Sequence, residues 1–211
     1  MAYDLEEQEK IDALRAWWDK YGVLCTAFLV AAVIAVLGWR GWQWYQGHEA
    51  DQAMGYFEAL ERAAGQSGDD AVARIKAASK TLRDDYASTG YAPRGVLVAA
   101  AALQRRHDLA GAGEQLEWLI HKGGDSALIA VARLRLAGIL LEQKRYDQAL
   151  AQLHDAPGAF TGLYADRRGD ILAAQGKTDD ARKAWAEAIK DLGGDSATQV
   201  IQLKIDALNG A

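Results

Sequence analysis

The sequence predicts an all-α protein in which one N-terminal membrane-spanning helix is followed by a domain of stacked helical repeats. A long uncharged apolar segment lies near the N-terminus. In the rest of the chain, apolar residues recur at spacings of three and four, which is the period of an α-helix, and no alternating β-branched pattern appears. The chain has only 2 prolines, and many of its 21 glycines fall at predicted breaks between helices.

The candidate membrane span is residues 21–39, YGVLCTAFLVAAVIAVLGW. At about 1.5 Å per residue, a helix of this length measures ~28 Å, close to the ~30 Å hydrocarbon thickness of a bilayer. Aromatic side chains gather at both ends of the segment, as is typical where a membrane meets water. We expect the following residues to lie at the membrane interface: Trp17, Trp18, Tyr21, Trp39, Trp42 and Trp44.

Three alternatives compete with the membrane span. A buried core helix rarely lacks a polar face over such a length. A cleaved signal peptide needs a basic start and a small-residue cleavage site, whereas here an acidic segment precedes the apolar run and Trp39 and Arg40 follow it. A dimerising helix is compatible with anchoring, because Ala27, Ala31 and Ala35 form a stripe of small residues.

The distribution of cations predicts the orientation of the span. Lys10, Arg15 and Lys20 precede it, and Arg40 is the one cation that follows it closely. Because Lys and Arg near the ends of a span favour the cytoplasmic side, residues 1–20 are predicted to form a cytoplasmic tail. The remainder of the chain is then expected outside the cytoplasm.

Beyond the span, residues 40–68 are predicted to form an aromatic interface and a connecting helix, and residues 69–211 the repeat domain. The three-and-four pattern continues to Ala64, so the helix is expected to run outward until the break at Gly65 to Gly68. The single cysteine, Cys25, lies inside the span. The domain is therefore expected to be held by packing without disulfides.

An internal repeat is the most informative feature of the C-terminal part. Ala112, Ala149 and Ala181 recur at intervals of 37 and 32 residues, and a large apolar residue follows each four positions later. These intervals bracket the 34-residue period of a tetratricopeptide repeat, whose small residues let helices approach closely around a continuous core. In the first unit His107 stands where the repeat has an inter-helix glycine. An antiparallel Ala-rich bundle is the alternative, since the intervals are unequal.

Two units match the repeat register well and supply the residues that we expect to pack it. They are Leu136, Ala137, Leu140, Ala149 and Leu153 in the second unit, and Gly169, Leu172, Gly176, Ala181, Trp185 and Ala188 in the third. Pro93 is expected at the first position of a helix, where its missing N–H costs nothing. A terminal helix over residues 195–208, capped by Asp195 or Ser196, is expected to cover the last unit.

No constellation of side chains in the sequence predicts catalysis or metal binding. The motifs that bind phosphate through glycine-rich loops and the G-x-S-x-G motif of serine hydrolases are absent. The histidines match no metal-ligand spacing: His48, His107, His121 and His154. Sequential carboxylates on a helix point about 100° apart, so the acidic pairs are interpreted as caps and solvated faces. The pairs are Asp69-Asp70, Asp84-Asp85 and Asp179-Asp180.

Two further functions are disfavoured by the sequence. The tripeptide Arg168-Gly169-Asp170 lies in a predicted helix, which argues against a role in adhesion. The net charge of −5 comes without a concentrated basic patch, which argues against nucleic acid. We expect neither an enzyme nor a binder of cofactors or small molecules, but a membrane-tethered module for protein–protein interaction.

The whole chain resembles the YfgM-like family of ancillary subunits of the bacterial SecYEG translocon. The resemblance is carried by the acidic N-terminal tail and by four short motifs. The motifs are Gly38-Trp-Arg-x-Trp42, Ala165-Asp-x-Arg-Gly-Asp170 with Gly176, Ala181-Arg-x-Ala-Trp185, and Leu203-Lys-Ile205. Departures from the family are the additional aromatic residues Trp44 and Tyr45 and a weakly marked first repeat.

The resemblance implies a single-span protein of the bacterial inner membrane with a periplasmic tetratricopeptide-like domain and no catalytic residues. It further implies association with the SecYEG translocon and with a membrane-anchored parvulin-like periplasmic chaperone, and assistance to exported polypeptides. The alternative is an envelope scaffold or regulator that uses the same repeats to bind partners in cell division or cell-wall synthesis. The residues alone do not separate these two functions.

Overall fold

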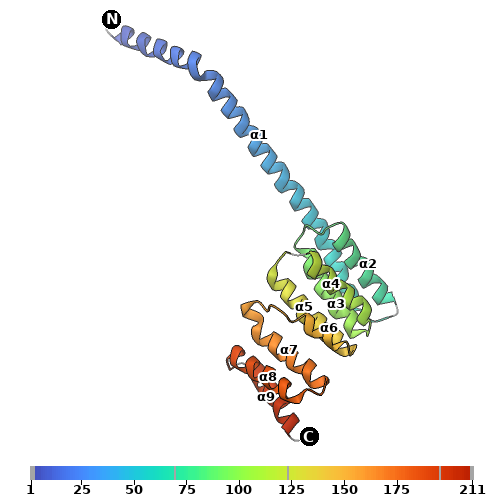
Figure 1. The fold of residues 1–211 in the computed structure, drawn as a ribbon. Helices are drawn as coiled ribbons and strands as arrows, with labels where there is room; N and C mark the ends of the chain where they lie inside the picture. The colour runs from blue at the N-terminus through green and yellow to red at the C-terminus, as the bar shows by residue number, and fades with distance from the viewer. Residues whose placement is uncertain (1–2, 69, 123, 195, 210–211) are drawn as a thin grey trace. The chain divides into compact units, whose positions relative to one another are not determined.

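The computed structural model describes residues 3–68, 70–122, 124–194 and 196–209, and every regular element in these ranges is a helix. The α-helices are α1 (Tyr3–Gly65), α2 (Asp70–Asp84), α3 (Tyr91–Arg105), α4 (Leu109–Lys122), α5 (Ser126–Glu142), α6 (Tyr146–Ala151), α7 (Thr161–Ala174), α8 (Thr178–Leu192) and α9 (Ser196–Asn209). A short 3-10 helix, η1 (Gly158–Phe160), precedes α7. The all-α prediction is confirmed (Figure 1).

The chain divides into two compact units, Met1–Asp51 and Gln52–Ala211, and α1 contributes to both. The sequence assigned residues 40–68 to a connecting helix and began the repeat domain at residue 69. In the structure the last turns of α1 belong to the second unit, because Ala53 and Leu60 are fully buried in the core that they share with α2 and α3.

Within the first unit α1 is continuous and contains no proline. Its apolar side chains are exposed along their length; Val23 is 82% exposed and Phe28 80%. Among the described residues, α1 is the one helix long and apolar enough to cross a membrane, and 6% of its most apolar 18-residue stretch is buried. A core helix of a soluble protein would be buried, so this exposure separates α1 from that alternative.

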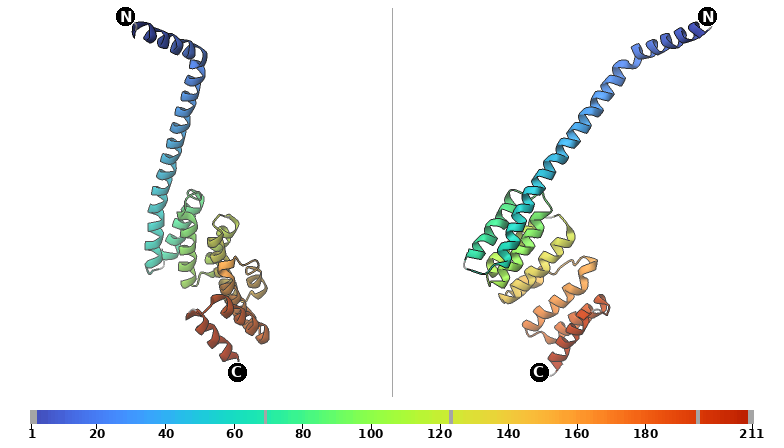
Figure 2. Two further views of the ribbon diagram at one scale, coloured as in Figure 1. Left: turned by 90° about the vertical axis from the view of Figure 1, so that its left-hand side faces the viewer. Right: turned by 180° about the vertical axis from the view of Figure 1, so that it is seen from behind.

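In the second unit, consecutive helices pack side by side as antiparallel pairs (Figure 2). Helix α3 packs on α4, α5 on α6 and α7 on α8, and α9 lies against α8 as the predicted terminal helix. Its expected cap at Asp195 lies outside the described residues. Pro93 is the third residue of α3 rather than the first. The fold tolerates it there because the first four N–H groups of a helix have no partner within the helix.

The turns inside the three repeat units have the same hydrogen bonds. In each, an N–H donates to a carbonyl five residues earlier, which is the outer bond of a Schellman motif. The pairs are Asp108 to Leu103, Arg145 to Leu140 and Lys177 to Leu172, at 3.0, 2.8 and 2.9 Å. The residue before each donor has positive φ: 61° at His107, 59° at Lys144 and 77° at Gly176. His107 therefore takes the backbone conformation of the glycine that it replaces.

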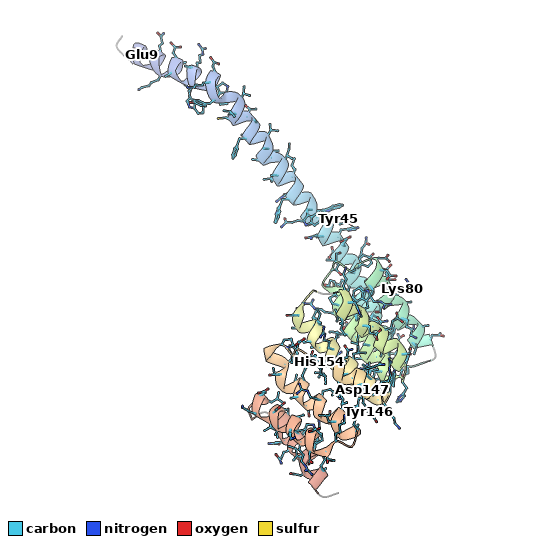
Figure 3. The ribbon with its side chains drawn as sticks, viewed as in Figure 1. Glu9, Tyr45, Lys80, Tyr146, Asp147 and His154 are labelled. Atoms are coloured by element: carbon cyan, nitrogen blue, oxygen red, sulfur yellow. The ribbon has the colours of Figure 1, made fainter. Side chains whose placement is uncertain are left out.

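The second unit departs from the expected repeat in its second helix. Helix α6 has 6 residues, whereas α4 has 14 and α8 has 15. Tyr146 and Asp147 mark its first turn in Figure 3. Hydrogen bonds from the N–H groups of Gln152 and Leu153 to carbonyls three residues earlier close its last turn. The positive φ of 54° at Asp155 and the proline at 157 then keep the helix from resuming. Leu153 is nevertheless 3% exposed, so its packing role survives the loss of helix.

Candidate protein-binding site

The residues expected to pack the repeats are mostly in the interior. Nine of them are buried: Leu136, Ala137, Leu140, Ala149, Leu153, Gly169, Ala181, Trp185 and Ala188. Leu172 is half-buried at the edge of a small core formed by α7, α8 and α9. Gly176 is exposed and packs against nothing; its contribution is the positive φ of the turn.

Gly169 and Trp185 form the tightest contact of the third unit. A Cβ atom at Gly169 would lie 2.4 Å from both Cδ1 and Nε1 of the Trp185 indole, far inside van der Waals contact. Trp185 is 3% exposed, and its indole N–H has no hydrogen-bond partner. The missing side chain at Gly169 is therefore what allows α8 to place a tryptophan against α7.

An ionic cluster ties α9 to α7 beside this tryptophan. The ammonium of Lys204 donates hydrogen bonds to Oδ1 of Asp166 and to Oδ1 of Asp170, each at 2.7 Å, and lies 5.8 Å from the centroid of the Trp185 ring. Burial lowers the pKa of Lys204, but the two carboxylates outweigh it, so the pKa lies above its ordinary value. Asp170 is engaged here and Gly169 is buried, so the Arg168-Gly169-Asp170 segment has no adhesion geometry.

Two buried polar contacts were not found from the sequence. The hydroxyl of Ser79 donates to Oε1 of Gln115 at 2.6 Å, which joins α2 to α4. The hydroxyl of Tyr164 donates to the carbonyl of Ala130 at 3.0 Å, which joins α7 to α5, and burial raises the pKa of this tyrosine. Buried polar groups need such partners, so both contacts fix the register of neighbouring helices. In the sequence, these contacts could have been suspected from a polar residue on an otherwise apolar helix face.

Arg106 is a further residue that sequence analysis missed. Its guanidinium donates to the carbonyls of Ala64 at 3.1 Å and Gln66 at 2.6 Å, and at 3.4 Å to that of Ala63. These carbonyls end α1, where a helix leaves its last acceptors without partners. Arg106 therefore caps α1 from the turn between α3 and α4.

The aromatic residues predicted at the membrane interface are exposed along α1: Trp17, Trp18, Tyr21, Trp39, Trp42 and Trp44. Some contact one another within the helix. The rings of Trp17 and Tyr21 have centroids 5.7 Å apart, and Trp44 stacks on His48 at 5.8 Å. The six side chains are 39–74% exposed, and membrane contact at these positions stays a prediction.

Among the described residues, no group of three His, Cys, Asp or Glu side chains is arranged to hold a metal ion. Four members of the acidic pairs, Asp70, Asp84, Asp179 and Asp180, lie on helices and pair with cations, whereas Asp69 lies outside the described residues. Asp84 bonds to Lys80 on α2, which Figure 3 labels, while Asp179 lies 3.0 Å from Arg182 and Asp180 3.5 Å from Lys183. Their geometry suits solvated faces and does not bring two carboxylates onto one bond.

At least two hollows open on the described surface of the repeat domain. One, of about 300 Å³, lies between the turn before α3 and the end of α4 and is walled by Pro93, Trp118 and Leu128. The other, of about 440 Å³, lies between the end of α1 and α2. We call it the α1–α2 groove and define it by Ala59, Ala63, Ala77 and Ala78 with Arg62 and Arg74. Hollows between helices of this kind suit the side chains of a protein partner.

Comparison with known proteins gives the family. A tetratricopeptide repeat-like domain family matches residues 15–210. The chain is 33% identical to the ancillary SecYEG translocon subunit of Neisseria gonorrhoeae, over 99% of this chain and 100% of that protein. It is 26% identical to the proteins of the same name from Haemophilus influenzae, over 99% and 100%, and Escherichia coli, over 96% and 97%.

No solved structure matches the chain closely enough to add to this comparison. The match to the repeat-like family covers α1 from residue 15 onward as well as the repeat domain, and the relatives align along their full or nearly full length. The resemblance seen in the sequence is therefore confirmed. The chain belongs to the family of ancillary SecYEG translocon subunits, which carries a tetratricopeptide repeat-like domain.

Proposed function

We propose that this protein is a non-enzymatic ancillary subunit of the SecYEG translocon, in which α1 anchors a protein-binding repeat domain to the bacterial inner membrane. The observation that carries the proposal is the combination within one chain of an exposed apolar helix and a stack of helical repeats. Relatives that align over the whole chain are named for the same association. Anchoring raises the effective concentration of the domain near a membrane partner to the order of mM, so weak contacts suffice.

The orientation that we propose places residues 1–20 in the cytoplasm and the repeat domain in the periplasm. Its support is the excess of Lys and Arg before residue 21 over the single Arg40 that closely follows the span. The test replaces Cys25 by Ala and introduces either Glu9→Cys or Lys190→Cys. A membrane-impermeant maleimide applied to spheroplasts should label Lys190→Cys and spare Glu9→Cys. The reverse pattern would overturn the orientation.

The partners that we propose are the translocon, a membrane-anchored parvulin-like periplasmic chaperone and exported polypeptides in transit. The sequence resemblance supports the chaperone, and the hollowed, mixed polar and apolar surface of the repeats supports binding of polypeptide segments. A chaperone-like role needs only such reversible contacts.

Site-specific photocrosslinking in intact membranes tests this function. A photoreactive side chain is placed at Met54 on α1, at Arg135 on α5 or at Leu163 on α7, all of which are exposed. The same group at exposed Lys190 on α8 measures random collisions. Adducts with SecYEG subunits and the chaperone, above the level seen from Lys190, are expected. Their absence from all three positions would refute the proposal, and adducts with division or cell-wall proteins would favour an envelope scaffold.

A further inference from the structure

The α1–α2 groove is a built feature of the first helix pair. Ala59 precedes buried Leu60 on α1 and Ala78 precedes buried Ser79 on α2, while Ala63 is itself buried in the core. One residue is about 100° of rotation around a helix, so the groove runs along the seam of α1 and α2 beside the core-facing stripes.

Small side chains keep the groove open. Ala59, Ala63, Ala77 and Ala78 form its floor, and Tyr56, Gln66 and Thr81 complete its lining. Its volume of about 440 Å³ is large enough for several side chains of a partner. Helices approach closely where their facing residues are small, so an alanine floor suits the ridge of another helix.

Both charged residues that line the groove are cations. The Nε of Arg62 donates to the carbonyl of Glu58 at 3.3 Å, which leaves the terminal nitrogens of its guanidinium available. Arg74 lies 3.8 Å from Asp70, and the two side chains are 48% and 86% exposed. Such an exposed pair at this distance contributes little and exchanges readily for a partner's carboxylate. The groove therefore offers two guanidinium groups beside an apolar floor.

The end of α1 does not oppose an anion at this site. The C-terminus of a helix carries partial negative charge on its last carbonyls. Here Arg106 donates hydrogen bonds to the carbonyls of Ala63, Ala64 and Gln66, which neutralises that end. These last carbonyls are thus paired with a cation.

We infer that the α1–α2 groove binds an acidic amphipathic helix of a partner protein, whose apolar side chains lie on the alanine floor and whose carboxylates pair with Arg62 and Arg74. The inference rests on the proposed function and names the chemistry of one partner. A second copy of the chain is the weaker candidate, because a symmetric contact between two grooves would bring the arginines of both copies together and these would repel one another. A flat lipid surface does not fit into a concave seam of alanines.

The test uses the full chain in nanodiscs and two synthetic helical peptides of about five turns. The peptides have the same leucine and alanine positions and carry either Glu or Lys at the flanking positions. Binding is measured by fluorescence anisotropy. The Glu peptide should bind, and the Lys peptide should bind at least about tenfold more weakly.

Two variants test whether the peptide binds in the α1–α2 groove. Arg62→Glu with Arg74→Glu should reverse the preference, so that the Lys peptide binds better. Ala77→Trp, on an exposed alanine of the floor, should abolish binding of both peptides by filling the groove. The matched control reverses two exposed cations on and beside α8, Lys177→Glu with Lys190→Glu, with the same change in net charge and no expected effect.

Circular dichroism checks that each variant keeps its helix content. Equal binding of the Glu peptide by the groove variants and by the control variant would overturn the inference, as would equal binding of both peptides by the unaltered chain. If the inference about the groove fails in either way, SecYEG adducts from Met54, Arg135 or Leu163 would still leave the proposed function standing. Loss of those adducts with intact peptide binding would refute the proposed function and leave the inference about the groove standing.

Discussion

Gly169→Ala is the substitution for which the structure predicts the clearest loss of stability. Alanine suits a helix interior better than glycine by about 0.5–1 kcal/mol, so the local preference of α7 favours the change. Against this, the new Cβ would lie 2.4 Å from two atoms of the Trp185 indole and 2.8 Å from Cε2. Ordinary contact requires the ring to move by about 1 Å, and overpacking of this kind costs about 1–3 kcal/mol. The expected net destabilisation is about 1–2 kcal/mol.

The assay is urea unfolding of the full chain in detergent, followed by far-UV circular dichroism, with variants compared at equal slope. Trp185→Leu provides the decisive cycle, since it removes the ring that the methyl group would strike. In that background Gly169→Ala should become neutral or stabilising, with a coupling energy of about 1–3 kcal/mol. An equal loss of stability in both backgrounds would refute the steric argument.

Gly138→Ala is the matched control for this cycle. Gly138 is also a buried glycine inside a helix, but a Cβ there would lie 3.6 Å from its nearest neighbours, the Arg167 guanidinium atoms, in ordinary contact. The substitution should therefore raise stability by about 0.5–1 kcal/mol through helix preference alone. A loss at Gly138 as large as that at Gly169 would show that any added methyl group disturbs these helices.

Three further predictions concern backbone conformation, capping and pH. His107→Gly should raise the unfolding free energy by about 0.5–1 kcal/mol, and Gly176→Ala should lower it by about 1 kcal/mol, because both positions have positive φ; opposite signs in urea unfolding would contradict this. Arg106→Met should cost about 1–3 kcal/mol in the same assay by leaving carbonyls at the end of α1 unpaired, and a neutral result would exclude the capping role. Hydrogen bonds from Lys76 and from the backbone N–H of Gly111 hold the pKa of Asp108 below its ordinary value. Its contribution to stability is thus present above about pH 4 and is lost as pH falls through the folded-state pKa. Asp108→Asn should make the fall of Tm below pH 4 shallower, and an unchanged slope would exclude this contribution.

Local patterns in the sequence determined the helical class, the exposed apolar helix and the repeat register. An α-helix is specified by residues three and four apart, so its presence can be predicted without knowing what it packs against. The break after Gly65 is confirmed for the same reason. Ala112, Ala149 and Ala181 are each fully buried at the same place in the three units, because the repeat imposes one local geometry on all of them. The predicted sides of the membrane remain predictions.

Only the tertiary structure decided which residues meet across helices. The second compact unit begins at Gln52, α6 stops at Ala151, and the α1–α2 groove forms between two segments that the sequence treated separately. The cap that Arg106 provides to α1 and the cluster around Lys204 join residues 34 to 43 positions apart. Such contacts depend on how neighbouring helices are oriented and spaced. Helical periodicity fixes which face of each helix is apolar, but it does not fix which polar side chain on the next helix that face will meet.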